Sequence, residues 1–169
     1  MVRVLFVCMG NICRSPMAEG AFRHLAAAAG LLDREDGMMT DSAGTSRHHV
    51  GEPPDPRAVR AARARGYDIA HQRARQVAVA DFDRFDYLIA MDRDNLAHLE
   101  RLAPADSAAR LGLFLSYAAG VGLDEVPDPY FGGEGGFEGC LGLIEAAAHG
   151  LFAHILADHF PDHVARACR

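Results

Sequence analysis

The sequence of 169 residues contains no lysine and no tryptophan. All 17 basic residues are arginines, no run of them stands out, and the formal net charge is -6. Because nucleic-acid-binding proteins carry clustered positive charge, we expect no nucleic-acid partner. The apolar stretch from Val4 to Met9 is too short to span a membrane, and no clean small-residue cleavage site follows it. We therefore expect neither a membrane partner nor export.

Cysteine is also scarce. The four thiols lack the density and the regular spacing of a secreted disulfide scaffold; they are Cys8, Cys13, Cys140 and Cys168. We therefore expect reduced cysteines in a cytoplasmic protein. The histidines near the C-terminus do not share one helix face, and Pro161 interrupts the last pair of them. The sequence thus predicts no metal site and no cofactor.

The chain is long and apolar enough for one domain with a substantial core. Half of its residues are hydrophobic, and a typical domain has ~100 to 200 residues. No linker or internal repeat divides the sequence, so we expect a single domain over residues 1–169. The sequence leaves the oligomeric state open.

Hydrophobic patterns predict strands that alternate with helices. The continuous apolar run at 2–7 is typical of a strand buried on both faces of a parallel sheet. The predicted order is strand 2–7, helix 16–29, strand 38–42, loop 43–56, helix 57–65, strand 86–91, helix 92–103, strand 111–115, loop 123–139 and helix 140–159. This alternation predicts an α/β fold with an open, mostly parallel sheet, whose ligands bind at the carboxyl ends of the strands.

A cysteine and an arginine with five residues between them follow the first predicted strand, in the segment CMGNICRSP. Free backbone amides and the positive end of the next helix would form a site here for a phosphate-sized anion. Arg14 adds a planar, bidentate clamp, and Gly10 and Asn11 tolerate the positive φ of a tightly wrapped loop. Besides Cys8 and Arg14, the predicted anion-binding residues are Met9, Gly10, Asn11, Ile12, Cys13 and Ser15.

These surroundings would also activate the sulfur of Cys8. Amides and a guanidinium favour the charged form of a thiol, so we expect the thiolate to be the resting form. A thiolate that attacks phosphorus needs an acid for the leaving oxygen and then a base for water. Asp128 in VPDPYF is the best candidate, because prolines stiffen this loop and Tyr130 and Phe131 could flank a flat substrate ring. The loop lacks the lysine of nucleotide-binding P-loops.

Four segments carry a resemblance to a known family: VCMGNICRSPMAE, DSAGT, the ARQ after His71, and PDPY. In these the chain resembles the low-molecular-weight protein-tyrosine phosphatases. The resemblance implies a single domain with an open four-stranded parallel sheet, helices on both faces, and the phosphate-binding loop between the first strand and the first helix. It also implies a hydrolase that acts on phosphotyrosine protein substrates through a cysteinyl-phosphate intermediate.

The same resemblance assigns roles to individual residues. It makes Cys8 the nucleophile, Arg14 the phosphate clamp and Asp128 the general acid and base. It further implies a supporting network made of Asn11, Ser15, Ser42 and His71. It also implies a reversible disulfide between Cys8 and Cys13, which would protect the nucleophile from irreversible oxidation.

Three positions bear on the choice of substrate. Arginine-phosphate phosphatases that resemble this chain carry Thr where Ile12 stands, so Ile12 favours phosphotyrosine. Many relatives place Trp or Tyr at the position of His48, where it walls the substrate cleft, and a second Tyr at Phe131. These two departures leave the substrate preference open.

Three alternatives use the same loop. An arsenate reductase resembles this scaffold, but relatives with a cysteine relay carry a Cys pair in mid-chain, and here none lies between Cys13 and Cys140. A protein-arginine phosphatase is the second alternative. A phosphopeptide-binding module would lack the nucleophile or the acid, whereas Cys8 and Asp128 are both present.

Overall fold

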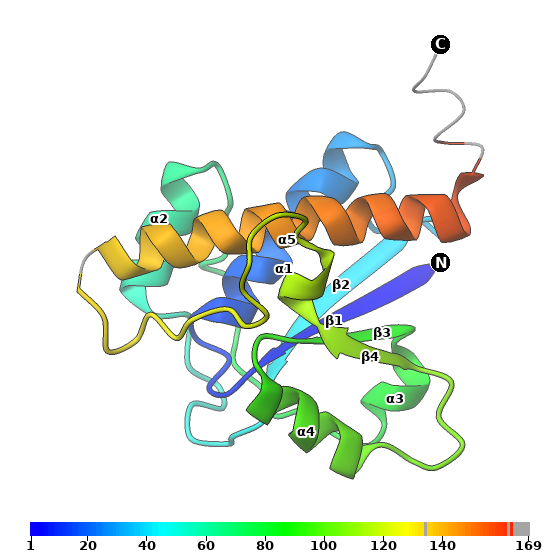
Figure 1. Cartoon of the computed structure of the whole chain (residues 1–169), viewed down its shortest axis with the longest axis horizontal. Helices are drawn as coiled ribbons and strands as arrows, with labels where there is room; N and C mark the ends of the chain where they lie inside the picture. The colour runs from blue at the N-terminus through cyan, green and yellow to red at the C-terminus, as the bar shows by residue number, and fades with distance from the viewer. Residues whose placement is uncertain (134, 162, 164–169) are drawn as a thin grey trace.

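The structure is a computed structural model, which describes residues 1–133, 135–161 and 163. A sheet of four parallel strands in the order β2-β1-β3-β4 forms its centre (Figure 1). The strands are β1 (Val2–Cys8), β2 (Met38–Gly44), β3 (Tyr87–Ala90) and β4 (Arg110–Leu113). The predicted α/β fold with an open four-stranded parallel sheet is confirmed.

β1 lies inside the sheet and sends its side chains into two separate cores. Val4 and Phe6 join the larger core, whereas Leu5 and Val7 join the smaller core on the other face. All four side chains are fully buried. Successive residues of a strand face opposite sides of the sheet, so a strand that is covered on both faces needs a continuous apolar run.

Helices cover both faces of the sheet (Figure 1). They are α1 (Arg14–Ala28), α2 (Pro56–Ala64), α3 (Asp81–Arg84), α4 (Arg93–Leu102), the short 3-10 helix η1 (Phe114–Tyr117) and α5 (Gly135–His159). The larger core contains residues of α1, α2 and α5, and the smaller core contains residues of α3 and α4. Asp92 caps α4 by accepting a hydrogen bond from the N–H of Asn95.

Two predicted elements need correction, and one helix was missed. The segment 123–139 was expected to be a loop throughout, but α5 already begins at Gly135. Phe137 is buried against the core, and this burial outweighs the low helix propensity of glycine. The last predicted strand ends early, at Leu113, because the chain turns into η1 there. The short helix α3 was not predicted at all.

α5 is long and apolar enough to cross a membrane by length and composition alone. Its apolar residues have partners within the fold, because Leu141, Ile144 and Leu151 are fully buried in the larger core. At Gly150 a Cβ would collide with the backbone oxygen of Tyr117, so glycine permits a close approach of α5 to η1. Packing against the core therefore accounts for the buried apolar residues of this helix.

Candidate active site

The loop between β1 and α1 folds around the sulfur of Cys8. Cys8 is the last residue of β1, and Arg14 is the first residue of α1. Asn11 adopts the left-handed backbone conformation, with φ at 55°, and its N–H donates to Cys8 Sγ at 3.2 Å. Asparagine tolerates this conformation better than most residues. The loop therefore directs backbone N–H toward the sulfur, as an anion-binding concavity does.

Asn11 and Ser15 brace the loop. The Asn11 side-chain amide donates to Ser15 Oγ at 3.0 Å. The same hydroxyl lies 3.1 Å from Cys8 Sγ and 3.3 Å from the carbonyl oxygen of Ala43. It has one proton, which can be donated either to the sulfur or to the carbonyl. Hydrogen bonds to charged acceptors are the stronger ones, so this hydroxyl can stabilise Cys8 in its thiolate form.

Arg14 is buried and held in a fixed orientation. Its Nη1 donates to Asp92 Oδ2 at 2.6 Å and to the carbonyl oxygen of Val126 at 3.1 Å. Burial alone lowers the pKa of Arg14, but Cys8 and the hydrogen bond to Asp92 raise that pKa overall above its usual value. The guanidinium is therefore charged at any working pH. Sequence reasoning did not assign Asp92, although its position directly after a strand was a usable signal.

Cys8, Arg14 and Asp128 border one cavity of about 200 Å³. Arg14 Nη2 donates to Asp128 Oδ2 at 3.3 Å, and Asp128 Oδ1 accepts from the N–H of Tyr130 at 3.1 Å. The Asp128 side chain is 38% exposed, so it can exchange protons with water. The remaining residues that line the cavity are Met9, Gly10, Ile12, Cys13, His49, Tyr130 and Phe131. Residues far apart in the sequence thus meet at the carboxyl end of β1.

Comparison with known proteins identifies the family. A family model described as low molecular weight phosphotyrosine protein phosphatase matches residues 3–160. The chain belongs to this family. It is accordingly an enzyme, a phosphatase, as the resemblance of its motifs implied.

Curated relatives and solved structures agree with this assignment. The low molecular weight protein-tyrosine-phosphatase of Streptomyces coelicolor is 48% identical over 90% of this chain and 93% of its own length. The crystal structure of YfkJ from Bacillus subtilis has a TM-score of 0.85 and 42% identity, and covers 94% of this chain and 96% of its own. The Drosophila arginine phosphatase has a TM-score of 0.82 and 34% identity, over 89% of this chain and 96% of its own.

The wall of the phosphatase cavity contains His49 in place of the predicted His48. His48 is exposed and lies outside the cavity lining, whereas His49 packs over Gly10. A Cβ on Gly10 would come within 3.1 Å of the His49 ring. His49 Nδ1 lies 2.8 Å from Glu52 Oε2, which fixes the ring orientation. Sequence spacing does not define which side chain of an irregular loop faces inward, so it could not place His49 at this wall; the role of His48 stays a prediction.

The predicted supporting network is only partly present. Asn11 and Ser15 are bonded to each other, but within the described residues neither Ser42 nor His71 bonds directly to them. Ser42 Oγ instead donates to Glu19 Oε2 at 2.8 Å. His71 is exposed, and its supporting role stays a prediction.

The buried position beside the loop belongs to the next residue, Gln72. Its side-chain amide donates to the carbonyl oxygen of Pro16 at 3.3 Å. Because Pro16 lies in the first turn of α1, Gln72 braces this helix directly behind the loop.

The three described cysteines, Cys8, Cys13 and Cys140, are free and buried. Burial raises the pKa of the Cys13 thiol, and the charges of Asp55 and Cys8 raise it further. Burial likewise raises the pKa of Cys140 to about 12. Cys168 lies outside the described residues. In the described part of the chain, no group of three or more His, Cys, Asp and Glu side chains could hold a metal ion.

One side of the cavity mouth is aromatic. Phe131 is 90% exposed, and its ring packs edge-on against Tyr130 with centroids 5.0 Å apart. Arg57 lies over the Tyr130 ring at 5.3 Å and donates to the Tyr130 carbonyl oxygen at 3.1 Å. Asp55 in turn accepts two hydrogen bonds from the Arg57 guanidinium. Sequence reasoning missed Arg57, which fixes this aromatic wall from α2.

Proposed function

We propose that the chain hydrolyses phosphotyrosine in proteins through a cysteinyl-phosphate intermediate on Cys8. The observation that carries the proposal is that Cys8 and Arg14, from the loop between β1 and α1, border the same cavity as the distant Asp128. A nucleophile, a cation for the phosphoryl oxygens and a proton donor are the groups that this reaction requires.

In the first step, the Cys8 thiolate attacks phosphorus and a P–S bond forms as the bond from phosphorus to the aryl oxygen breaks. Asp128 donates its proton to that leaving oxygen, so the product departs as a neutral phenol. Arg14 and the loop N–H groups bind the phosphoryl oxygens, on which charge is spread in the transition state.

In the second step, the same Asp128 acts as a base. Its carboxylate takes a proton from water, the oxygen of that water attacks phosphorus, and the P–S bond breaks. The sulfur leaves as a thiolate, and inorganic phosphate is released. Ser15 Oγ, 3.1 Å from the sulfur, can donate to the departing thiolate and so favours this step.

The form of the cavity supports an aryl phosphate as the substrate. Tyr130 and Phe131 provide exposed ring faces at the mouth, where a tyrosine ring can stack. Ile12 presents an apolar side chain to the same cavity. These residues favour phosphotyrosine over phosphoarginine, the substrate of the second candidate function that the Drosophila arginine phosphatase suggests. Comparing the rates with matched phosphotyrosine and phosphoarginine peptides distinguishes the two.

We also propose that the enzyme acts in the cytoplasm. We further propose that Cys13 protects Cys8 by forming a reversible disulfide with it. Support for the disulfide comes from the free state of both thiols and from their positions on the same cavity. After a peroxide oxidises Cys8 to a sulfenic acid, the Cys13 sulfur would displace water to form the disulfide. A reducing compartment would then restore the thiolate.

The decisive experiment combines two variants with acid-quench trapping. Cys8→Ser should abolish turnover of p-nitrophenyl phosphate and leave no trapped phosphoenzyme. Asp128→Ala should lower turnover by about 10² to 10⁴ with phosphotyrosine and less with p-nitrophenyl phosphate, whose phenolate needs no proton to leave.

Cys140→Ala provides the matched control, because it removes a buried thiol that lies outside the cavity lining. It should retain both turnover and the trapped intermediate. Undiminished turnover in Cys8→Ser would overturn the proposal.

A further inference from the structure

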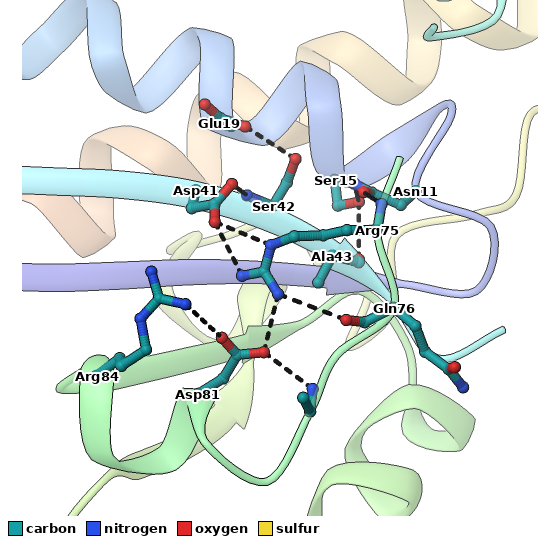
Figure 2. Close-up of polar contacts among 11 residues, drawn as sticks. Asn11, Ser15, Glu19, Asp41, Ser42, Ala43, Arg75, Gln76, Asp81 and Arg84 are labelled. Atoms are coloured by element: carbon teal, nitrogen blue, oxygen red, sulfur yellow. Dashed lines mark hydrogen bonds and ion pairs between the residues drawn. The ribbon is translucent and has the colours of Figure 1, made fainter. Parts of the chain in front are cut away.

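The ARQ segment lies beside the catalytic loop but has no part in the mechanism described so far. Arg75 is its central residue, and its guanidinium lies between two carboxylates from different elements (Figure 2). Arg75 Nε donates to Asp41 Oδ2 of β2 at 3.0 Å, and Nη1 donates to Asp81 Oδ2 of α3 at 2.9 Å. Nη2 lies 2.8 Å from the same Asp41 oxygen, without hydrogen-bond geometry.

Only the Asp81 end of this ion cluster is buried, because the side chains of Arg75 and Asp41 are 29% and 38% exposed. The Asp81 side chain is only 2% exposed, and its Oδ2 also accepts from the N–H of Ala78 at 2.9 Å. Burial lowers the pKa of Arg75, but Asp81 and Asp41 raise it overall above its usual value. A lysine has one charged nitrogen and could not replace the fork that reaches both carboxylates. The cluster therefore fixes the chain around Arg75 to two separate elements.

The main chain of Arg75 contacts the catalytic loop. Its N–H donates to Asn11 Oδ1 at 2.9 Å, and its carbonyl oxygen accepts from the N–H of Gly44 at 2.8 Å. Asn11 uses the other end of the same amide to donate to Ser15 Oγ at 3.0 Å. A continuous chain of hydrogen bonds thus runs from Arg75 through Asn11 and Ser15 to the sulfur of Cys8.

Asn11 needs this external support. Its left-handed conformation, with φ at 55°, is unfavourable for residues other than glycine, although asparagine tolerates it better than most. Such a conformation persists only when the surroundings hold it in place. Asn11 Oδ1 accepts a hydrogen bond from the Arg75 N–H. This bond fixes which end of the Asn11 side-chain amide points toward Ser15. It therefore also keeps the Asn11 N–H directed at the sulfur, at 3.2 Å.

We propose that Arg75 is a positioning residue for the nucleophile: anchored by Asp41 and Asp81, it orients Asn11 and, through Asn11, the donors that hold the Cys8 sulfur. The inference rests on the proposed cysteinyl-phosphate mechanism, because it concerns the sulfur that attacks phosphorus. It assigns a function to two sequence motifs at once, since Arg75 belongs to ARQ and Asp41 begins DSAGT.

The test uses Arg75→Gln and Arg75→Lys with two readouts besides activity. The first is the pH dependence of Cys8 alkylation by iodoacetate, which reports the thiolate directly. The second is the division of any loss between kcat and KM. Both variants should shift the alkylation midpoint to higher pH and lower kcat on the order of 10-fold to 10²-fold, because a small misplacement of a reacting group has effects of this size. KM should change less.

Arg84→Gln is the matched control. Arg84 approaches the other oxygen of Asp81, at 3.9 Å, and has a largely exposed side chain. The Arg84→Gln change removes a positive charge near the Asp81 carboxylate, but it does not alter the main chain that contacts Asn11. The alkylation profile and kcat of this variant should match those of the wild type.

A double variant distinguishes positioning from general stabilisation. If Arg75 acts through Asn11, then Arg75→Gln should cost far less in an Asn11→Ala background than in the wild type. Additive losses in kcat would overturn the proposal, as would a folded Arg75→Lys enzyme with a wild-type alkylation profile. A wild-type enzyme that formed no phosphoenzyme would instead contradict the proposed cysteinyl-phosphate mechanism, on which the role of Arg75 rests.

Discussion

Arg14 is held by hydrogen bonds to three other protein groups. Asp92 and the carbonyl of Val126 hold Nη1 at 2.6 and 3.1 Å, whereas Asp128 meets Nη2 at the longer distance of 3.3 Å. We expect the phosphate to replace the weakest of these contacts, that with Asp128. The exchange would leave Arg14 fixed by Asp92 and would release the Asp128 carboxyl group to act as an acid. The same set of contacts would thus hold the Arg14 cation in place and leave the Asp128 carboxyl group free to move.

A buried carboxyl group behind the loop gives the enzyme a defined pH dependence of stability. Burial raises the pKa of Glu19 from 4.5 to about 7, although Ser42 donates to it. Between these values the folded state binds the proton more tightly than the unfolded state. The free energy of unfolding therefore falls as the pH rises from about 5 through 7, by about 3 kcal/mol if fully expressed.

Glu19→Gln keeps an oxygen acceptor for Ser42 and removes the ionisation. It should match the wild type at pH 5 and be the more stable protein at pH 8, as measured by urea unfolding. Equal differences between the two proteins at both pH values would contradict this prediction.

The order of the four strands and the longer helices was predictable from the sequence because these elements carry local signals. The continuous apolar run of β1, for example, is recognised from neighbouring residues alone. The start of α5 was missed because its Gly-rich first turns are helical only through the burial of Phe137. η1 was missed because the apolar residues of a strand and of a buried 3-10 turn look alike in sequence.

The candidate site was likewise predictable only where its residues are close together in the sequence. Residues within CMGNICRSP were found because one loop places them all around the anion site. Asp92 and Arg75 were not assigned: the pairing of β1 with β3 brings Asp92 to that loop, and the bridge between Gly44 and Gln76 brings Arg75 there. His49 lines the cavity wall and His48 does not. Which of these neighbours faces inward depends on the local conformation of the loop, and an irregular loop has no periodicity from which to predict it.

The end of β2 sets how closely the loop can pack. A Cβ on Gly44 would lie 2.6 Å from the carbonyl oxygen of Met9 and 3.2 Å from Asn11 N, so a side chain there must displace the loop. Gly44→Ala should lower kcat and cost about 1–3 kcal/mol of stability, as overpacking does. Steady-state kinetics and thermal unfolding measure the two effects.

Gly142→Ala is the comparison for Gly44→Ala, because nothing lies within 4 Å of a Cβ at that helical position. This control should keep its activity and gain a little stability, since alanine favours helix over glycine. Wild-type turnover in Gly44→Ala would show that the loop tolerates the displacement.

The site depends on the whole arrangement of the sheet and its connections. Cys8, the proposed nucleophile, ends β1, Asp92, which holds Arg14, follows β3, and Asp128, the proposed acid, lies between η1 and α5. These segments are far apart in the sequence and meet only in the folded chain, so the complete anion site does not exist in the unfolded chain. A bound oxyanion should therefore stabilise the fold by mass action.

Inorganic phosphate is the simplest probe of this coupling. At 100 times its dissociation constant it should add about 2.7 kcal/mol to the free energy of unfolding. For a chain of this size, such a gain raises the unfolding temperature by roughly 5 to 10 °C. Phosphate also stabilises proteins in general by exclusion from their surfaces, so the comparison needs a variant without the clamp. Arg14→Met should lose most of the phosphate-dependent increase, whereas Arg84→Gln should retain it. An equal increase in Arg14→Met would mean that phosphate acts on the protein surface and not at the loop.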